Sequence, residues 1–319
     1  MGLLSYCRYV LTLGTLPVKS RFLGARSIHD ERREMALKLT LLGTGTPRPS
    51  LERNCTANLL QIGTINILFD AGRGVTTQLV KAGLHPRDID YIFITHHHFD
   101  HIGNLGDLLM AAWNDGRVEP TYIFGPDGTE AIIDHLLNGI YRRDILFRLK
   151  ESEFLAHAMP DIRDLVKVRD IPAQGGYQTA DWNVRSEQVE HGHALGMTHE
   201  EWPCFGYRVE AEGKVLAISG DTVDCDGVRT LAENADLLLQ CCYLAEAEID
   251  TADKRVLSDQ VLASATQANR IAKAANVKKM VLTHLAPKSE AMLSAVLAEA
   301  KEGLKGETII GADMMSFDI

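Results

Sequence analysis

Short apolar runs bounded by Gly, Asp and Pro alternate along the chain with longer segments in which apolar residues recur every three or four positions. Runs of the first kind predict buried strands, and segments of the second kind predict amphipathic helices. The predicted strands are residues 38–42, 58–62, 65–70, 91–95, 121–124, 165–169, 184–190, 205–210, 214–219, 237–241, 279–283 and 308–311. The predicted helices are residues 75–82, 105–113, 129–141, 258–274 and 289–301. Residues 140–162 are rich in charge and lack a clean period, so we interpret them as a lid or an insert.

The order of these elements indicates the fold class. Strands alternate with helices, and no internal repeat, low-complexity tract or linker divides the region that contains them. This pattern predicts an α/β protein built as a four-layer αββα sandwich. We place this domain at residues 35–319, after an N-terminal extension or targeting segment at residues 1–34.

One polar run, THHHFDH at residues 95–101, follows directly on an apolar strand. Neutral imidazole and carboxylate are ligands that zinc accepts, and iron and manganese accept them as well. In the spacing H-x-H-x-D-H, His96 and His98 can share one metal ion. Asp100 and His101 begin a turn and can hold a second ion beside it. A solvated loop or a chance His tract explains this four-ligand pattern poorly.

Three later segments can supply the remaining ligands of a two-metal site. They are the segment with His191 and His193, the turn with Asp221 after an apolar strand, and His284 after another such strand. A single His or Asp at a strand end is more often a cap or a satisfied polar group. All three segments, in this order after the H-x-H-x-D-H run, make a strong combined signal for a dinuclear centre.

These motifs resemble the metallo-β-lactamase superfamily, and within it the ribonuclease Z-like branch. The resemblance runs from about Leu37 to the C-terminus. Besides the metal motifs, it includes LGTGTP at residues 42–47, LFDAG at 68–72, FGPDG at 124–128 and FGYR at 205–208. The resemblance implies the same four-layer αββα sandwich and a dinuclear metal site.

The resemblance also implies a role for each candidate ligand. Two divalent ions are implied, with zinc as the first expectation and manganese or iron as alternatives. Asp100 and Asp221 are the candidate catalytic carboxylates. One metal ion is held by His96, His98 and His191, the other by Asp100, His101 and His284, and Asp221 bridges both.

Three further residues are candidates for lining the pocket or supporting the ligands. His191 is preferred over His193 as the ligand because Val-x-His-Gly resembles the family pattern, but the insertion at 194–201 leaves room for the opposite assignment. His193 is then a candidate substrate contact or a hydrogen-bond donor to a ligand. Asp70 is a candidate to orient a ligand histidine, and Tyr243 can offer its phenol to an oxyanion. Capping and packing are the alternative roles for these two.

Two departures from the branch bear on the substrate. Its tRNA-processing members transfer protons with the Glu of a His-Glu-Ala-Thr motif and with the His of a His-Ser/Thr-Thr motif. This chain reads LQCCY at residues 239–243 and LASA at 262–265, so Gln240 replaces the Glu and Leu262 replaces the His. Neither replacement can transfer a proton, which favours a substrate with a good leaving group.

Composition bears on partners and compartment. The formal net charge is −10, from 33 Lys and Arg against 43 Asp and Glu, so the chain lacks the excess of positive charge that is typical of nucleic-acid-binding proteins. Six scattered cysteines predict no disulfides and a reducing compartment. No transmembrane segment is predicted. Residues 1–34 resemble a mitochondrial transit peptide in composition, with a plain extension as an equal alternative, so we expect an intracellular protein, cytoplasmic or mitochondrial.

We therefore expect a dinuclear metal-dependent hydrolase that uses a metal-bridging hydroxide on a small ester, lactone, lactam or related substrate. One alternative is a ribonuclease Z-like phosphodiesterase that processes tRNA 3′ ends. Another is a metal-binding module without turnover. The complete ligand set argues against the module, and the net acidity with the two replaced residues argues against the nuclease. Substrate identity and homo-oligomerisation are left open.

Overall fold

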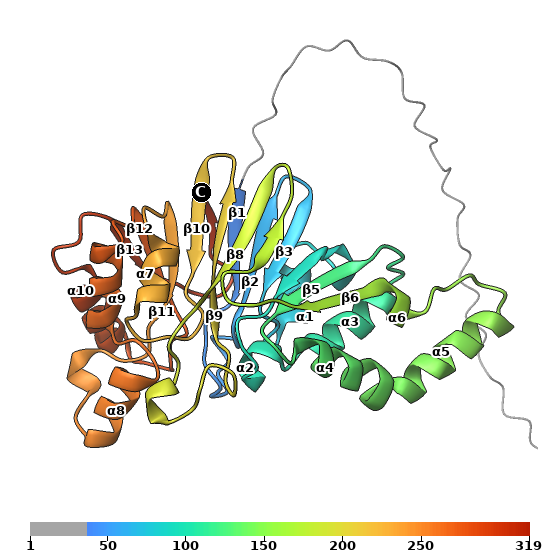
Figure 1. The fold of residues 1–319 in the computed structure, drawn as a ribbon, viewed down its shortest axis with the longest axis horizontal. Coiled ribbons are helices and arrows are strands. Elements are labelled where there is room, and N and C mark those ends of the chain that lie inside the picture. The colour runs from blue at the N-terminus through green and yellow to red at the C-terminus, as the bar shows by residue number, and fades with distance from the viewer. Residues whose placement is uncertain (1–36) are drawn as a thin grey trace, which may run out of the picture. The chain divides into compact units, whose positions relative to one another are not determined.

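The computed structural model describes residues 37–319, which form two mixed sheets packed face to face with helices on both outer sides (Figure 1). The predicted four-layer αββα sandwich is therefore confirmed. The predicted N-terminal segment, residues 1–34, lies outside the described residues, so its boundary with the domain stays a prediction.

The first sheet contains β1 (Leu37–Gly43), β2 (Ala57–Ile62), β3 (Ile65–Phe69), β4 (Tyr91–Phe93), β5 (Thr121–Gly125), β6 (Val166–Asp170) and β14 (Ser316–Asp318), in the order β14-β1-β2-β3-β4-β5-β6. The second contains β7 (Gly176–Gln178), β8 (Trp182–Gln188), β9 (Phe205–Ala211), β10 (Lys214–Ile218), β11 (Leu237–Cys241), β12 (Lys279–Thr283) and β13 (Glu307–Ile310), in the order β13-β12-β11-β10-β9-β8-β7. Every predicted strand is present. The strands β7 and β14 escaped the prediction because three residues carry too little alternation to be recognised.

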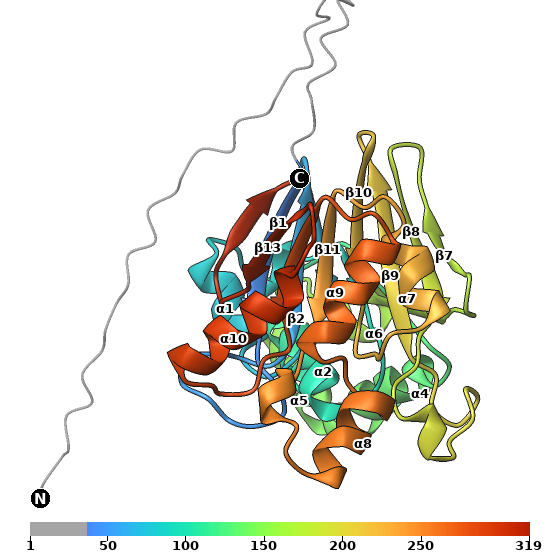
Figure 2. The same ribbon diagram turned by 90° about the vertical axis from the view of Figure 1, so that its left-hand side faces the viewer.

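Helices cover the outer face of each sheet. The first sheet packs against α1 (Val75–Lys81), α3 (Leu105–Asn114) and α4 (Thr129–Asp134). The second packs against α7 (Asp226–Ala232), α9 (Ala265–Ala274) and α10 (Glu290–Lys301), which lie in front of its strands in Figure 2. The remaining helical segments are η1 (Pro86–Asp88), α2 (Phe99–Ile102), η2 (His135–Ile140), α5 (Arg142–Phe154), α6 (Ile162–Leu165), η3 (His193–Leu195), η4 (Glu246–Glu248) and α8 (Ala252–Gln260).

Large apolar side chains fill the space between the two sheets. Phe69 and Phe93 of the first sheet stack with ring centres 5.5 Å apart, and Tyr207 of the second sheet lies 5.5 Å from Phe93. All three are fully buried, and aromatic groups of this size contribute much of the apolar area that a core removes from water. This packing holds the ends of the two sheets, and the loops that follow them, in a fixed relation.

The single helix predicted at 258–274 is wrong. Helix α8 ends at Gln260 and α9 begins at Ala265, because the side chain of Ser264 accepts a hydrogen bond from the backbone N–H of Gln267 and so caps a new helix. Between the two helices the backbone N–H of Ala263 donates to the carbonyl of Thr222 at 2.8 Å. The break therefore brings an extended segment beside the turn that contains Asp221.

The segment 140–162 contains helix α5 and the loop that follows it. Within α5 only Ile145 and Ser152 are buried, so no apolar stripe marks this helix in the sequence.

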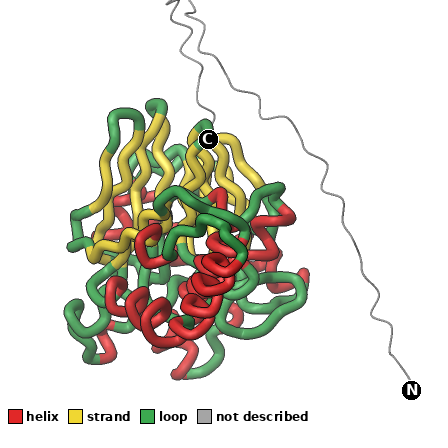
Figure 3. Tube along the Cα trace, turned by 90° about the vertical axis from the view of Figure 1, so that its right-hand side faces the viewer, coloured by secondary structure: helices red, strands yellow, loops and turns green. Residues whose placement is uncertain are grey.

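Parallel pairing explains why the polar strand ends meet. Strand β3 pairs in parallel with β4, and β10 and β12 each pair in parallel with β11. The carboxyl ends of parallel strands lie at the same edge of a sheet, and Figure 3 shows loops and helices gathered beyond one end of the strands. The candidate ligands follow β4, β8, β10 and β12, so they come together at this edge.

Candidate metal centre

The first ligands follow β4, where the chain turns from strand into the short helix α2. His96 is fully buried just beyond the strand. His98 is the N-cap residue of α2, and Asp100 and His101 follow within its first turn. One short segment thus presents all four side chains of the H-x-H-x-D-H spacing at the edge of the first sheet.

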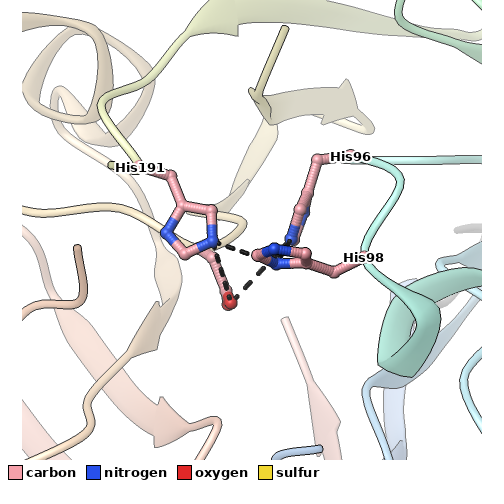
Figure 4. A group of neighbouring side chains, drawn as sticks. His96, His98 and His191 are labelled. Atoms are coloured by element: carbon pink, nitrogen blue, oxygen red, sulfur yellow. Dashed lines mark hydrogen bonds and ion pairs between the residues drawn. The ribbon is translucent and has the colours of Figure 1, made fainter. Parts of the chain in front are cut away.

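Three imidazoles and one carboxylate form a first group (Figure 4). The Nδ1 atom of His98 lies 3.0 Å from Nε2 of His96 and 3.1 Å from Nε2 of His191. Oδ2 of Asp221 lies 4.0 Å from Nε2 of His96 and 3.9 Å from Nε2 of His191. The four donor atoms all lie within 4.8 Å of one another, which suits the ligands of one metal ion.

A second group adjoins the first through the same carboxylate. Nε2 of His284 lies 3.3 Å from Oδ2 of Asp100, and Nε2 of His101 lies 3.7 Å from that oxygen. Oδ2 of Asp221 is 3.5 Å from Nε2 of His101 and 3.3 Å from Nε2 of His284. Asp221 therefore faces both groups. His284 has a left-handed backbone with φ of 56°, a strained conformation of the kind that recurs at functional sites.

Asp70 and Thr95 set the proton positions of two imidazoles. One carboxylate oxygen of Asp70 accepts a hydrogen bond from Nδ1 of His101 at 2.7 Å, and the other accepts from the backbone N–H of Thr95 at 2.8 Å. The Thr95 hydroxyl donates to Asp70 at 2.9 Å, which leaves its oxygen to accept from Nδ1 of His96 at 3.0 Å. Both imidazoles thus carry a proton on Nδ1, which leaves Nε2 as the nitrogen that can bind a metal ion.

His191 is oriented in the same way, from the second sheet. Its Nδ1–H donates to the carbonyl of Val261 at 2.7 Å, so its Nε2 also carries a lone pair toward the group. Nε2 of His101 and Oδ1 of Asp100 are buried and have no hydrogen-bond partner within residues 37–319. Imidazole nitrogens and carboxylate oxygens are thus crowded together, and the carboxylates need a cation beside them, either a protonated imidazole or a metal ion. These nitrogen and oxygen donors suit a divalent metal ion.

Burial keeps the three imidazoles of the first group neutral. Desolvation lowers the pKa of His96 well below its usual value, lowers that of His98 to about 4, and lowers that of His191. All three imidazoles are therefore unprotonated at neutral pH, the form that binds a metal ion.

The second group carries the charge. Burial opposes protonation of His101, but the carboxylates of Asp221 and Asp70 outweigh it and raise its pKa well above the usual value. Burial likewise opposes ionisation of Asp221, but His284 and His101 outweigh it and hold the pKa of that carboxyl well below its usual value. A protonated His101 thus balances the carboxylates in the metal-free protein, and a bound cation would take over that role.

The other predicted residues lie around the two groups. His193 belongs to neither: its Nε2–H donates to the carbonyl of Trp202 at 2.8 Å, and its Nδ1 accepts from the backbone N–H of His191 at 3.0 Å. Tyr243 is half-buried, and its ring centre lies 6.5 Å from that of His284. Asp70 bonds the ligand candidate His101, as expected of a residue that orients it.

The structure corrects the residue that faces the centre from β11. Alternate residues of a strand point to opposite faces, and Gln240 points away: its amide donates to the carbonyl of Cys241 at 3.0 Å. The small cavity beneath the centre is lined by Cys241, together with Asp221 and His284. Leu262 packs against Cys241. Cys241 and Leu262 are therefore the side chains at the two positions where the sequence predicts a missing proton relay.

Sequence reasoning missed Thr95, Val261 and Trp202. Val261 acts through its backbone carbonyl, and a backbone contact cannot be predicted from the type of residue. Thr95 is the first residue of the run 95–101, directly before His96, and this position was the only indication in the sequence that it supports a ligand. Trp202 directly follows the insertion 194–201 and precedes β9, and its ring centre is 4.6 Å from that of His98.

The sandwich fold and the paired donor groups define a metalloenzyme of the metallo-β-lactamase class. The chain matches the beta-lactamase superfamily domain over residues 65–285 and belongs to that family. It is 30% identical over 256 residues to ribonuclease Z of Mycobacterium avium (strain 104), covering 79% of this chain and 86% of the relative. It is 29% identical over 259 residues to ribonuclease Z of Mycobacterium bovis (strain BCG / Pasteur 1173P2), with the same coverage of both chains.

Solved structures agree on the fold. The human tRNase Z short form is 25% identical with a TM-score of 0.62, covering 88% of this chain and 99% of that one. A metallo-beta-lactamase fold protein of Bacillus subtilis is 20% identical with a TM-score of 0.66, covering 89% of this chain and all of that one (100%). The chain is thus a metal-dependent hydrolase of the ribonuclease Z-like branch. None of the helices described in residues 37–319 has the length and apolar character needed to cross a membrane.

Proposed function

We propose that this protein is a dinuclear metal-dependent hydrolase of small substrates with good leaving groups, such as activated esters, lactones and lactams. In this proposal Asp221 would be a ligand of both of two divalent ions, preferably zinc. When bound, the ions would supply Lewis-acid activation of water and of the substrate oxygen. The further ligands would be His96, His98 and His191 for one ion, and Asp100, His101 and His284 for the other.

The surrounding side chains would keep this centre in a fixed geometry. Asp70 holds the proton of His101 on Nδ1, and the carbonyl of Val261 does the same for His191. Each bond directs a lone pair toward the ions without a prior proton shift, and such partners typically affect metal affinity 10- to 100-fold. Ligand orientation thus depends on buried hydrogen bonds from both sheets.

The proposed class of substrate rests on the side chains of Cys241 and Leu262, which cannot transfer a proton. Burial raises the pKa of the Cys241 thiol to about 12, so it stays protonated at neutral pH and is a poor proton acceptor. Leu262 has no proton to give. A leaving group that must be protonated as it departs would receive no help from these two positions. General acid–base help is typically worth 10²–10⁴-fold, so its absence favours substrates that do not need it.

A second candidate function is ribonuclease Z-like cleavage of RNA, which the names of the relatives favour. The charge of this chain supports it less. The formal net charge is −10, and on α5, which begins with Arg142 and Arg143, Arg148 pairs with Glu151 at 3.3 Å and Lys150 pairs with Glu153 at 2.7 Å. These pairs reduce the positive potential that an RNA backbone would meet.

A leaving-group series tests the proposal. Aryl esters and lactones of graded leaving-group pKa would be compared with a precursor tRNA on the zinc-loaded protein, with Asp221→Ala as the inactive control. We expect a steep fall in rate as the leaving-group pKa rises, and weak or absent RNA cleavage. Efficient precursor-tRNA cleavage, with no small substrate turned over, would replace the first proposal by the second.

A further inference from the structure

Trp202 lies against the first ligand group. Its indole ring centre is 4.6 Å from that of His98, with the planes tilted by 50°, and 5.9 Å from that of His96. The side chain is half-buried, with one part packed on the apolar core behind the second sheet. The indole is thus partly accessible, and its ring lies beside two candidate metal ligands.

His193 holds this indole in place through the backbone. Its Nε2–H donates to the carbonyl of Trp202 at 2.8 Å, while its Nδ1 accepts from the backbone N–H of His191 at 3.0 Å. The imidazole, whose side chain is only 6% exposed, therefore connects the two ends of the insertion 194–201. Gly192 has φ of 81°, a left-handed turn that lets the chain fold back so that this connection forms.

We propose that Trp202 determines specificity, as an aromatic wall for substrates that carry a planar apolar group next to the reacting centre, and that His193 is the residue that positions it. The inference rests on the proposed hydrolytic function of the metal centre. A substrate whose reacting oxygen reaches the ions has its substituent within reach of a ring in contact with His98. Stacking between aromatic groups there would favour an aryl over a methyl substituent by about three- to tenfold.

Binding of two carboxylates, phenylacetate and acetate, tests the wall without turnover. Both probes present the same anion to the zinc-loaded protein, and calorimetry gives their dissociation constants. We expect phenylacetate to bind about three- to tenfold more tightly than acetate, the Trp202→Phe variant to keep this preference, and the Trp202→Ala variant to lose it. A preference that survives in Trp202→Ala, or a wild-type protein without any preference, overturns the proposal.

Three variants of the same loop test the positioning role. His193→Asn keeps an acceptor for the His191 amide and loses the bond to Trp202, whereas His193→Ala loses both. His199→Asn is the matched control: His199 is 49% exposed and its ring packs 4.3 Å from that of His193, but it hydrogen-bonds Glu190 and makes neither of the two bonds of His193. We expect His193→Asn to lose the preference for phenylacetate while its zinc affinity stays within about twofold of wild type, and His193→Ala to lose about tenfold in zinc affinity as well.

The control His199→Asn should retain both properties. If both His193 variants keep the phenylacetate preference, His193 does not position the wall. Failure of the proposed function has a different signature: a protein that shows this preference but hydrolyses no member of the ester and lactone series would keep the aromatic wall and lose the proposed reaction.

Discussion

Replacing Asp70 with Asn is a sharp test of how the second group is oriented. The amide oxygen can still accept the backbone N–H of Thr95, which the carboxylate now accepts at 2.8 Å. The amide NH₂ then takes the place of the oxygen that accepts from Nδ1 of His101 at 2.7 Å. Two donors would face each other, so His101 is driven to move its proton to Nε2, the atom directed at the ions.

The size of the effect follows from that proton. A metal ion on Nε2 would force the remaining proton back to Nδ1, against the amide NH₂, and loss of such a supporting carboxylate typically costs 10- to 100-fold in metal affinity, about 1.4–2.7 kcal/mol. The first group depends less on this oxygen, because His191 is oriented by Val261. The Thr95 hydroxyl, which orients His96, can still donate to the other oxygen of residue 70, from which it lies 3.1 Å. We expect Asp70→Asn to bind one zinc ion nearly as wild type and the other 10- to 100-fold more weakly.

Chelator competition at neutral pH, with metal content measured at each step, resolves the two affinities. Asp313→Asn is the control, because the Asp313 carboxylate likewise accepts several hydrogen bonds, from Thr44 and Asn54, and none of these partners belongs to a donor group. The control should lower thermal stability and leave zinc affinity unchanged. Two wild-type zinc affinities in Asp70→Asn, or an equal loss in Asp313→Asn, would refute this account of the second group.

Three further predictions follow from the same geometry. Protein purified without chelator should contain about two zinc ions per chain, and Asp221→Ala should lose both metal and activity, as elemental analysis will show; an active metal-free enzyme would contradict this. His191→Ala should weaken zinc binding more than His193→Ala in a metal titration, and the reverse order would show that the ligand is His193. The metal-free protein should lose stability as pH falls from about 6.5 toward 4, because the unfolded chain binds a proton that His98, whose pKa is lowered to about 4 in the folded protein, does not bind. One such imidazole costs at most about 1.4 kcal/mol per pH unit, and less where solvent reaches it. The raised pKa of His101 adds stability that is constant below about 6.5 and is lost only at higher pH, so it does not offset this loss. Urea unfolding that is flat from pH 6.5 to 4 would exclude the effect.

Much of the fold was predictable because buried strands impose a simple pattern. The central strands of both sheets are nearly continuous apolar runs, as parallel strands covered on two faces require. Helices were harder wherever tertiary contacts decide their ends. The break between α8 and α9 depends on the cap at Ser264 and on the bond from Ala263 to Thr222, and neither can be read from periodicity across residues 258–274.

In the candidate site, too, the features set by residue type were predictable and those set by tertiary contacts were not. The sequence identifies the seven donors that the structure brings together in two groups, because ligand chemistry requires particular residue types at strand ends. It also proposed that Asp70 supports a ligand. It placed Gln240 at the centre instead of Cys241, since the face of a strand depends on register and a one-residue shift exchanges the two faces. Trp202 was overlooked because an aromatic residue is by default a packing residue.

The position of the donors makes metal binding inseparable from packing of the two sheets. His98 follows a strand of the first sheet and His191 a strand of the second, and their nitrogens lie 3.1 Å apart although 93 residues separate them in sequence. Asp100 and His284 meet in the same way across 184 residues. Because the unfolded chain cannot assemble such a set, ions that bind only the folded state stabilise it by mass action, by about 4 kcal/mol when free metal exceeds the dissociation constant a thousandfold. The buried carboxylates that require a protonated His101 in the metal-free protein are thus the same feature that makes this edge of the sandwich bind metal ions.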